Sequence, residues 1–331
     1  MNNFTKLILL VGALAGGAYY VKSKNIQIPN IPALSNLGIN NSAGGGAIGG
    51  GGGGGSSLTP MAAGSSIRIG SFNIQVFGSS KLAKPEVVDV LVKVVRQFDI
   101  IAIQEVRASD TTVVSQFLQM INSTGRHYDA VVGPRLGRTN SKEQYAIIFD
   151  QERIEVDPAS VYTVADPDDL LHREPLVAGF RVRGVPPEEA FTFSLVDIHT
   201  DPDETHQELD ALGDVYRAVR NDGRHEDDII LLGDLNVDDA HLGELGRVSD
   251  ITWIISGTPT NTRRTKQYDN MLFTRRATTE FQGRAGVFDF ANEYQLSMDA
   301  ALMVSDHMPI WAEFSPYEGG DAGRLATRPQ Q

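Results

Sequence analysis

The segment that most constrains this chain is a short apolar run, Ile229–Leu232, followed directly by Gly233-Asp234-Leu235-Asn236. Four large aliphatic residues in a row, bounded by glycine, are typical of a strand that is covered on both faces. Asp234 and Asn236 are two positions apart, so they project from the same side of an extended backbone and together could engage a metal ion or a phosphate. A Gly-Asp pair at a strand end is also a common turn, and this segment alone does not decide between the two.

Helix and strand patterns alternate and then give way to strands across residues 65–316, which we expect to form one domain. A strand at 67–73, a helix with Pro85 in its first turn, a strand at 98–104 and a helix capped by Ser109-Asp110 open the domain. The later expected strands are 128–133, 144–149, 153–163, 175–183, 190–199, 269–274 and 308–314, with a helix starting at Asp201-Pro202. We therefore predict an α/β fold, a four-layer αββα sandwich of two mostly antiparallel or mixed sheets with flanking helices.

Residues 1–64 differ from the rest. Residues 1–60 contain three lysines and no aspartate or glutamate, and the apolar run Leu7–Val21 spans roughly 22 Å as a helix. That length is short for a ~30 Å hydrocarbon core and suits a signal-peptide core, so residues 1–22 are predicted to be a signal peptide or an N-terminal membrane anchor, with a buried helix as the alternative. The glycine-rich residues 23–64 are predicted to be a flexible linker, and 317–331 a disordered tail. The expected location is extracytoplasmic, membrane-anchored or secreted.

Composition excludes several classes of chemistry. The chain has no cysteine, so disulfides, thiol nucleophiles and cysteine-based zinc sites are excluded. The formal charge is −13, and without the three N-terminal lysines the remainder is at −16. An acidic domain binds polyanions poorly, so nucleic-acid contact would need a few local arginines and a divalent cation. The acidic runs 166–169 and 226–228 are expected to be solvated loops.

Chemically capable side chains recur at the ends of the expected strands. They are Asn73, Glu105, His199, Asp234, Asn236, Asp269, Asp306 and His307. Carboxylate and amide oxygens with imidazoles and no thiols favour Mg²⁺, Mn²⁺ or Ca²⁺ over zinc. A metal on Glu105 could neutralise a phosphate while a histidine paired to a carboxylate takes a proton from water. The pattern predicts phosphodiester hydrolysis, since neither a glycine-rich nucleotide loop nor a nucleophilic serine setting is present.

Short motifs in a fixed order carry a family resemblance over about residues 67–314. They are Ser71-Phe72-Asn73-Ile74, Ile103-Gln104-Glu105-Val106-Arg107, Gly137-Arg138, Lys142-Glu143-Gln144-Tyr145, Arg173-Glu174-Pro175, His199, Gly233-Asp234-Leu235-Asn236, Tyr268-Asp269 and Ser305-Asp306-His307-Met308-Pro309. In these motifs the chain resembles the deoxyribonuclease I-like members of the endonuclease/exonuclease/phosphatase superfamily.

The resemblance implies a role for each matching residue. Glu105 would bind the catalytic metal with the help of Asn73, and Asp306 would complete the metal and phosphate site. The acid/base histidines would be His199, paired with Glu143, and His307, paired with Asp269, with Asp234 at the metal or the attacking water and Asn236 at the phosphate.

Three arginines are implied to bind substrate. Arg107 would enter the minor groove of DNA, Arg173 would contact the phosphate backbone, and Arg138 belongs to the same group. An arginine in that groove reads width and potential more than sequence. Arg107 and Arg173 could instead be structural ion-pair partners, and Asn73 could only tie down a loop. The chain departs from the family at Ser141 and Gln75, where a groove-facing tyrosine and arginine are expected.

The resulting hypothesis is a Mg²⁺- or Mn²⁺-dependent endonuclease, with Ca²⁺ as a further candidate ion, that cleaves DNA with little sequence specificity. The DNA is expected to be double-stranded. The alternative is a phosphoesterase of the same fold that acts on a phospholipid, sugar phosphate or nucleotide. A third hypothesis is a binding module that has lost catalysis. An uncleaved N-terminal segment would add a membrane as partner, and no obligate protein partner is expected.

Overall fold

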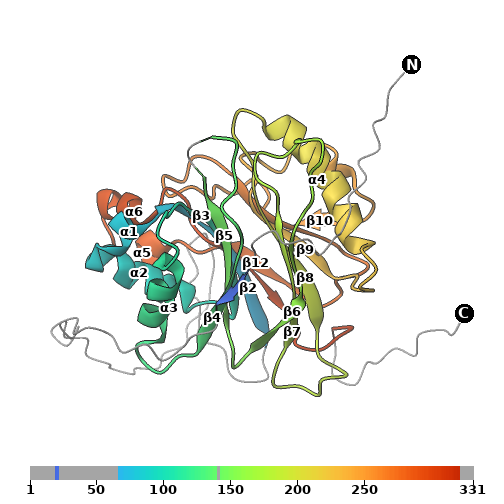
Figure 1. The fold of residues 1–331 in the computed structure, drawn as a ribbon, viewed down its shortest axis with the longest axis horizontal. Coiled ribbons are helices and arrows are strands. Elements are labelled where there is room, and N and C mark those ends of the chain that lie inside the picture. The colour runs from blue at the N-terminus through green and yellow to red at the C-terminus, as the bar shows by residue number, and fades with distance from the viewer. Residues whose placement is uncertain (1–18, 22–65, 140–141, 321–331) are drawn as a thin grey trace, which may run out of the picture.

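Two β-sheets packed face to face form the centre of the protein, and helices cover both outer faces (Figure 1). The computed structural model describes residues 19–21, 66–139 and 142–320, the first three as backbone only. Buried apolar side chains form three clusters, one between the sheets and one beneath the helices on each side. The predicted four-layer αββα sandwich is confirmed.

Among the described residues, the first sheet contains seven strands, and β2 and β3 are its one pair of parallel neighbours. Its order is β1 (Tyr19–Val21), β4 (Tyr128–Val132), β5 (Gln144–Asp150), β3 (Ile100–Val106), β2 (Ile67–Phe77), β13 (Ile310–Phe314) and β12 (Phe281–Val287). The second sheet has six strands, with β8 and β9 as its parallel pair. Its order is β10 (Ile251–Trp253), β11 (Asp269–Thr274), β9 (Ile229–Asp234), β8 (Thr192–His199), β7 (Leu176–Val182) and β6 (Ile154–Thr163).

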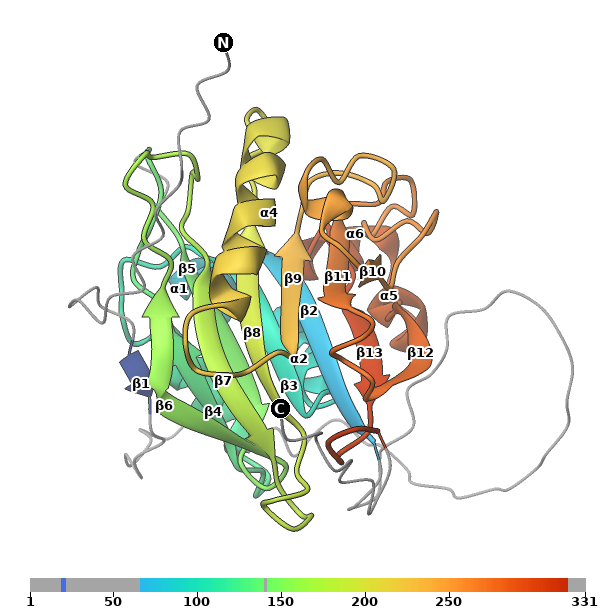
Figure 2. The same cartoon turned by 90° about the vertical axis from the view of Figure 1, so that its right-hand side faces the viewer.

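The helices divide between the two outer faces (Figures 1 and 2). Helix α4 (Thr205–Arg220) covers the outer face of the second sheet and buries Leu209, Leu212 and Tyr216. The helices on the first sheet are α1 (Ser79–Leu82), α2 (Pro85–Val95), α3 (Val113–Asn122), α5 (Phe290–Glu293) and α6 (Met298–Val304). A short 3₁₀ helix, η1 (Leu245–Arg247), follows β9.

Helix starts were the least accurate expectations. The helix expected at Asp201-Pro202 begins at Thr205, because the Asp201 carboxylate accepts a hydrogen bond from the backbone N of Asp203 in a turn that precedes the helix. Asp110 likewise accepts from the backbone N of Thr112, and α3 starts only at Val113. Strands β10 and β12 were missed, since β10 is three residues long and β12 contains two glycines and an arginine.

The described residues near the two chain ends can be compared with the predicted domain boundaries. Residues 19–21, at the end of the predicted leader, form β1 and pair with β4. The body continues past residue 316, since Tyr317 bridges to Ala190. The rest of the predicted leader and linker, apart from β1, and residues 321–331 lie outside the described residues. Within the described ranges, no helix combines the length and apolar character needed to cross a membrane.

We predict that Gly233→Ala is far more destabilising than Gly125→Ala. A Cβ on Gly233 would lie 1.9 Å from the carbonyl oxygen of Ile198 on the adjacent strand, whereas nothing lies within 4 Å at Gly125. Both glycines have positive φ, so Gly125→Ala measures the backbone strain alone, about 1 kcal/mol. Gly233→Ala should cost more than about 3 kcal/mol in denaturant unfolding. Equal costs at the two positions would refute this close strand contact.

Candidate active site

Seven strand ends meet at one edge of the sandwich. The carboxyl ends of β2, β3, β8 and β9 lie there, and so do the amino ends of β5, β11 and β13. Register fixes this arrangement, because Asp234 pairs with His199 on one side and with Asp269 on the other. Asn73, Glu105, His199 and Asp234 therefore lie at or near the carboxyl ends of strands, and Glu143, Asp269, Asp306 and His307 lie at or just before the amino ends of others.

One carboxylate oxygen, Oδ2 of Asp234, lies at the centre of the site. It accepts a hydrogen bond from Nδ2 of Asn73 at 3.0 Å. The Nε2 atoms of His199 and His307 lie 3.6 Å and 3.5 Å from the same oxygen. Asp234 thus joins an amide of the first sheet to two imidazoles that approach from different sheets.

His199 is held in orientation by Glu143. Nδ1 of His199 donates to Oε1 of Glu143 at 2.8 Å, since a carboxylate can only accept. The backbone N of His199 donates to the Tyr145 hydroxyl at 2.9 Å, and Nη1 of Arg173 donates to the His199 carbonyl at 3.0 Å. This arrangement directs Nε2 of His199 toward Asp234.

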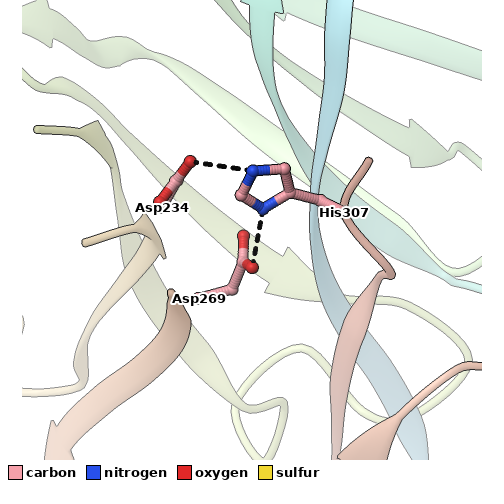
Figure 3. A group of neighbouring side chains, drawn as sticks. All are labelled: Asp234, Asp269 and His307. Carbon is pink, nitrogen blue, oxygen red and sulfur yellow. Dashed lines mark hydrogen bonds and ion pairs between the residues drawn. The ribbon is translucent and has the colours of Figure 1, made fainter. Parts of the chain in front are cut away.

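His307 is held in the same way from the opposite side, as Figure 3 shows. Its Nδ1 donates to Oδ2 of Asp269 at 2.9 Å. That oxygen also accepts from the Thr260 hydroxyl at 2.6 Å, and the Tyr268 ring lies 5.7 Å from the imidazole. The predicted pairs His199–Glu143 and His307–Asp269 are both formed.

The surrounding carboxylates favour protonated imidazoles in the metal-free protein. Burial alone would lower the pKa of His307, but Asp269, Asp234 and Asp306 outweigh it and raise that pKa to about 10. Burial also opposes the charge of His199, yet Glu143 and Asp234 raise its pKa above the ordinary value. A divalent cation beside these carboxylates would oppose the shifts and bring the histidines toward neutrality.

Backbone bulges direct Asn73 and Glu105 into the site. Glu105 has φ of 62°, and Gln75 and Val76 have φ of 41° and 53°, values that are rare outside glycine. The registers of β2 and β3 shift at these residues, so both strands bulge where they reach the site. Strained backbone of this kind costs about 1–3 kcal/mol per residue and is concentrated at functional positions.

The Glu105 carboxylate accepts two hydrogen bonds and forms one ion pair. Its oxygens accept from Nδ2 of Asn73 at 3.2 Å and from the backbone N of Val76 at 2.8 Å, and Nε of Arg107 lies 3.2 Å away. Asn73 also accepts from the backbone N of Gln75. Asn73 therefore ties down the loop and also contacts two site carboxylates.

The donor set fits a hard divalent cation. Glu105 and Asp306 supply carboxylates, Asp306 half-exposed at 47%, and Asn73 supplies an amide oxygen. Asp234, Asp269 and His307 offer a second group whose ligand atoms lie within 4.8 Å of one another. In that group the His307 imidazole lies between the two carboxylates, so Glu105, Asn73 and Asp306 are the residues that would hold the cation. There it would supply positive charge for a phosphate.

The arginines and Asn236 lie in different settings. Arg107 is 26% exposed and lies 3.2 Å from both Glu105 and Glu143. Arg173 is buried, forms an ion pair with Glu143 and donates from Nη1 to the His199 carbonyl. Asn236 donates to the Thr200 carbonyl at 2.8 Å and has φ of 53°. Arg138 lies apart from these contacts, paired with Asp169 and Glu204.

Lys81 is a site residue that the sequence patterns did not reveal. Its Nζ donates to the carbonyls of Ile74, Gln75 and Val304 at 2.6–2.7 Å and so joins β2 to α6. Burial lowers its pKa to about 8, against the opposing charges of Asp306 and Glu105. No sequence signal marks this lysine, because its partners are backbone carbonyls and one of them is distant in sequence.

The site and fold together define a metal-dependent phosphoester hydrolase. The model of the Endonuclease/Exonuclease/phosphatase family matches residues 70–307. The chain is 34% identical to deoxyribonuclease-1-like 1 of Cricetulus griseus, covering 77% of this chain and 86% of that protein. It is 31% identical to deoxyribonuclease-1 of Bos taurus, and that alignment covers 75% of this chain and 92% of that protein. The chain belongs to the endonuclease/exonuclease/phosphatase family, as a phosphodiesterase related to the deoxyribonuclease I group.

Solved structures support the fold alone. Humanized D. rerio TDP2 aligns with a TM-score of 0.51 at 13% identity, covering 75% of this chain and 98% of that one. The human Nocturnin catalytic domain with bound sulfate aligns with a TM-score of 0.51 at 18% identity, and the alignment covers 76% of this chain and 94% of that one. The shared feature is the two-sheet sandwich with its outer helices.

We predict that chelator-treated protein loses stability as the pH rises from 6.5 toward 10, through the loss of the His307 charge. The folded-state pKa of His307, about 10, lies above the unfolded value of 6.5. Its contribution is therefore complete below pH 6.5 and disappears as the pH passes 10. Unfolding free energies of the natural chain and His307→Gln should differ least at high pH. A difference that does not change with pH would contradict the charged imidazole.

Proposed function

We propose that this protein is a divalent-metal-dependent endonuclease that hydrolyses DNA phosphodiester bonds with little sequence specificity. The observation that carries the proposal is the paired arrangement of His199 and His307. Each imidazole binds a carboxylate through Nδ1 and presents Nε2 to the same oxygen of Asp234. Relatives at 30–34% identity that are named deoxyribonucleases support DNA as the substrate.

Two facing imidazoles suit hydrolysis because the reaction moves two protons. A P–O bond forms to water, which gives a proton to one Nε2, and the P–O bond to the leaving oxygen breaks as the other Nε2 donates a proton to it. Glu143 and Asp269 fix the tautomers and stabilise the charged imidazoles. The bound cation would offset phosphate charge during this step.

Arg107 is the residue best placed to contact DNA. Its partly exposed side chain lies at the edge of the site between Glu105 and Glu143, and Val76 beside it is 52% exposed. An arginine there would follow groove width and phosphate charge, which predicts broad specificity. Arg173 supports Glu143 from within the protein, and Arg138 would contact DNA only if the substrate reached Asp169 and Glu204.

A small phosphate ester is the second candidate substrate. The acidic remainder of the chain, with a charge of −16, and Gln75 in place of an arginine both reduce the attraction for DNA. Ser141 lies outside the described residues. We also propose an extracytoplasmic location, secreted or held at a membrane by residues 1–22. The apolar run Leu7–Val21 supports that part of the proposal.

The catalytic test is cleavage of supercoiled plasmid. The protein should nick plasmid with Mg²⁺ or Mn²⁺ and stop when a chelator is added. His199→Ala and His307→Ala should each slow nicking by about 100- to 10,000-fold, the contribution of a general acid or base. His206→Ala is the matched control, because that side chain is 92% exposed on α4. Full activity in either active-site variant would refute the mechanism.

The substrate test compares plasmid with small esters. We predict that plasmid is cleaved far faster than phospholipid vesicles, sugar phosphates or nucleotides. Arg107→Ala should reduce plasmid cleavage at least about 10-fold more than hydrolysis of a small phosphodiester, because only DNA reaches beyond the catalytic centre. An equal loss on both substrates would show that Arg107 only supports Glu105 and Glu143. Faster hydrolysis of a small ester would favour the second candidate.

A further inference from the structure

A second group of acidic side chains lies at the end of the sandwich opposite the active site. Asp228 directly precedes β9, and Asp234 ends that strand six residues later, roughly 20 Å away. Glu280 directly precedes β12, and Glu318 follows β13. Carboxylate oxygens of these three residues lie within 4.8 Å of one another. Sequence reasoning placed residues 226–228 in a solvated loop, and for Asp228 that expectation is wrong.

These carboxylates are buried and incompletely hydrogen-bonded. Asp228 and Glu280 are each 1% exposed. Oε2 of Glu280 has no hydrogen-bond partner in the described structure, and the buried hydroxyl of Thr278 is the side-chain donor beside Asp228. A buried, unpaired carboxylate oxygen is costly, so the group needs either protons or a cation.

Negative charges dominate the surroundings. Glu226 and Asp227 lie beside the group, and Asp228 belongs with them to a second set of close carboxylates. In the described part of the chain, none of these five acidic side chains forms an ion pair with a lysine, arginine or histidine. Burial, followed by repulsion from Glu280 and Glu318, raises the pKa of Asp228 to about 9. Burial also raises the pKa of Glu318, to about 7.

Hydrogen bonds of this group hold the last described segment, residues 315–320, against the sheets at the end opposite the active site. The backbone N of Gly319 donates to Oε1 of Glu280 at 2.6 Å, and the backbone N of Ser315 donates to the Glu280 carbonyl at 2.7 Å. Glu318 in turn accepts from the backbone N of Thr192 at 3.3 Å. The three carboxylates therefore come from segments that meet only in the folded protein.

We propose that Asp228, Glu280 and Glu318 form a structural binding site for Ca²⁺. Ca²⁺ accepts six to eight oxygens in flexible geometry, which suits three carboxylates from separate segments with a hydroxyl nearby. Mg²⁺ is less suitable, because it requires near-ideal octahedral geometry and retains its waters. Ca²⁺ would offset the buried charge and hold residues 315–320 against the sheets, independently of the catalytic site.

The test separates this site from the active site with paired variants of the full chain. Glu105→Gln removes the main active-site ligand and serves as the background. We expect Ca²⁺ to raise the Tm of this background by about 5 °C at saturation, because it binds the folded state. Adding Glu280→Gln should abolish that rise, and equilibrium dialysis with Ca²⁺ should show one fewer ion per chain. Glu188→Gln, an exposed acidic residue near the same end, is the matched control.

Two results would overturn the proposal. An equal Ca²⁺-dependent rise in Tm with and without Glu280→Gln would show that the carboxylates do not bind the ion. Absence of bound Ca²⁺ on the Glu105→Gln chain in dialysis would show that the carboxyls share protons instead. The dialysis result does not depend on whether Glu280→Gln folds, and neither readout requires DNA cleavage.

Discussion

The hydrogen bond from Asn73 to Asp234 is the contact on which the active site depends, because it joins the two sheets where the strand ends converge. The two histidine–carboxylate pairs also join one sheet to the other. Glu143 lies beside the first sheet and His199 ends a strand of the second, whereas Asp269 belongs to the second sheet and His307 precedes a strand of the first. In the part of the chain that the structure describes, each histidine and its carboxylate come from different sheets, so the packing of the sheets holds both pairs together.

The contact between the two sheets continues below the site. Nε2 of Gln104, in the first sheet, donates at 2.6 Å to Asp197 in the second, and burial raises the pKa of Asp197 well above its ordinary value. The raised pKa favours the protonated form of Asp197, which would place less negative charge near Glu143. The catalytic carboxylates nonetheless remain crowded around two imidazoles, and that crowding favours a divalent cation at the edge of the site.

The sequence indicated the layered fold and the strand ends well, because both depend on local patterns. Ile229–Leu232 predicts a doubly covered strand, and its structure is β9. The pairing of His199 with Glu143 came from family resemblance, since no local pattern joins residues 56 positions apart. The left-handed backbone at Gln75, Val76 and Glu105 was not predictable, because it is imposed by strand packing on residues that rarely adopt it.

The central claim is that a divalent cation completes this acid/base pair, and imidazole titration by nuclear magnetic resonance tests it most directly. The His199 and His307 signals can be assigned with His199→Gln and His307→Gln. In chelator, the His307 imidazole should stay protonated to about pH 10, and the pKa of His199 should lie above its ordinary value. With saturating Mg²⁺ and no substrate, both pKa values should fall toward neutrality. Titration curves that Mg²⁺ leaves unchanged would contradict the account.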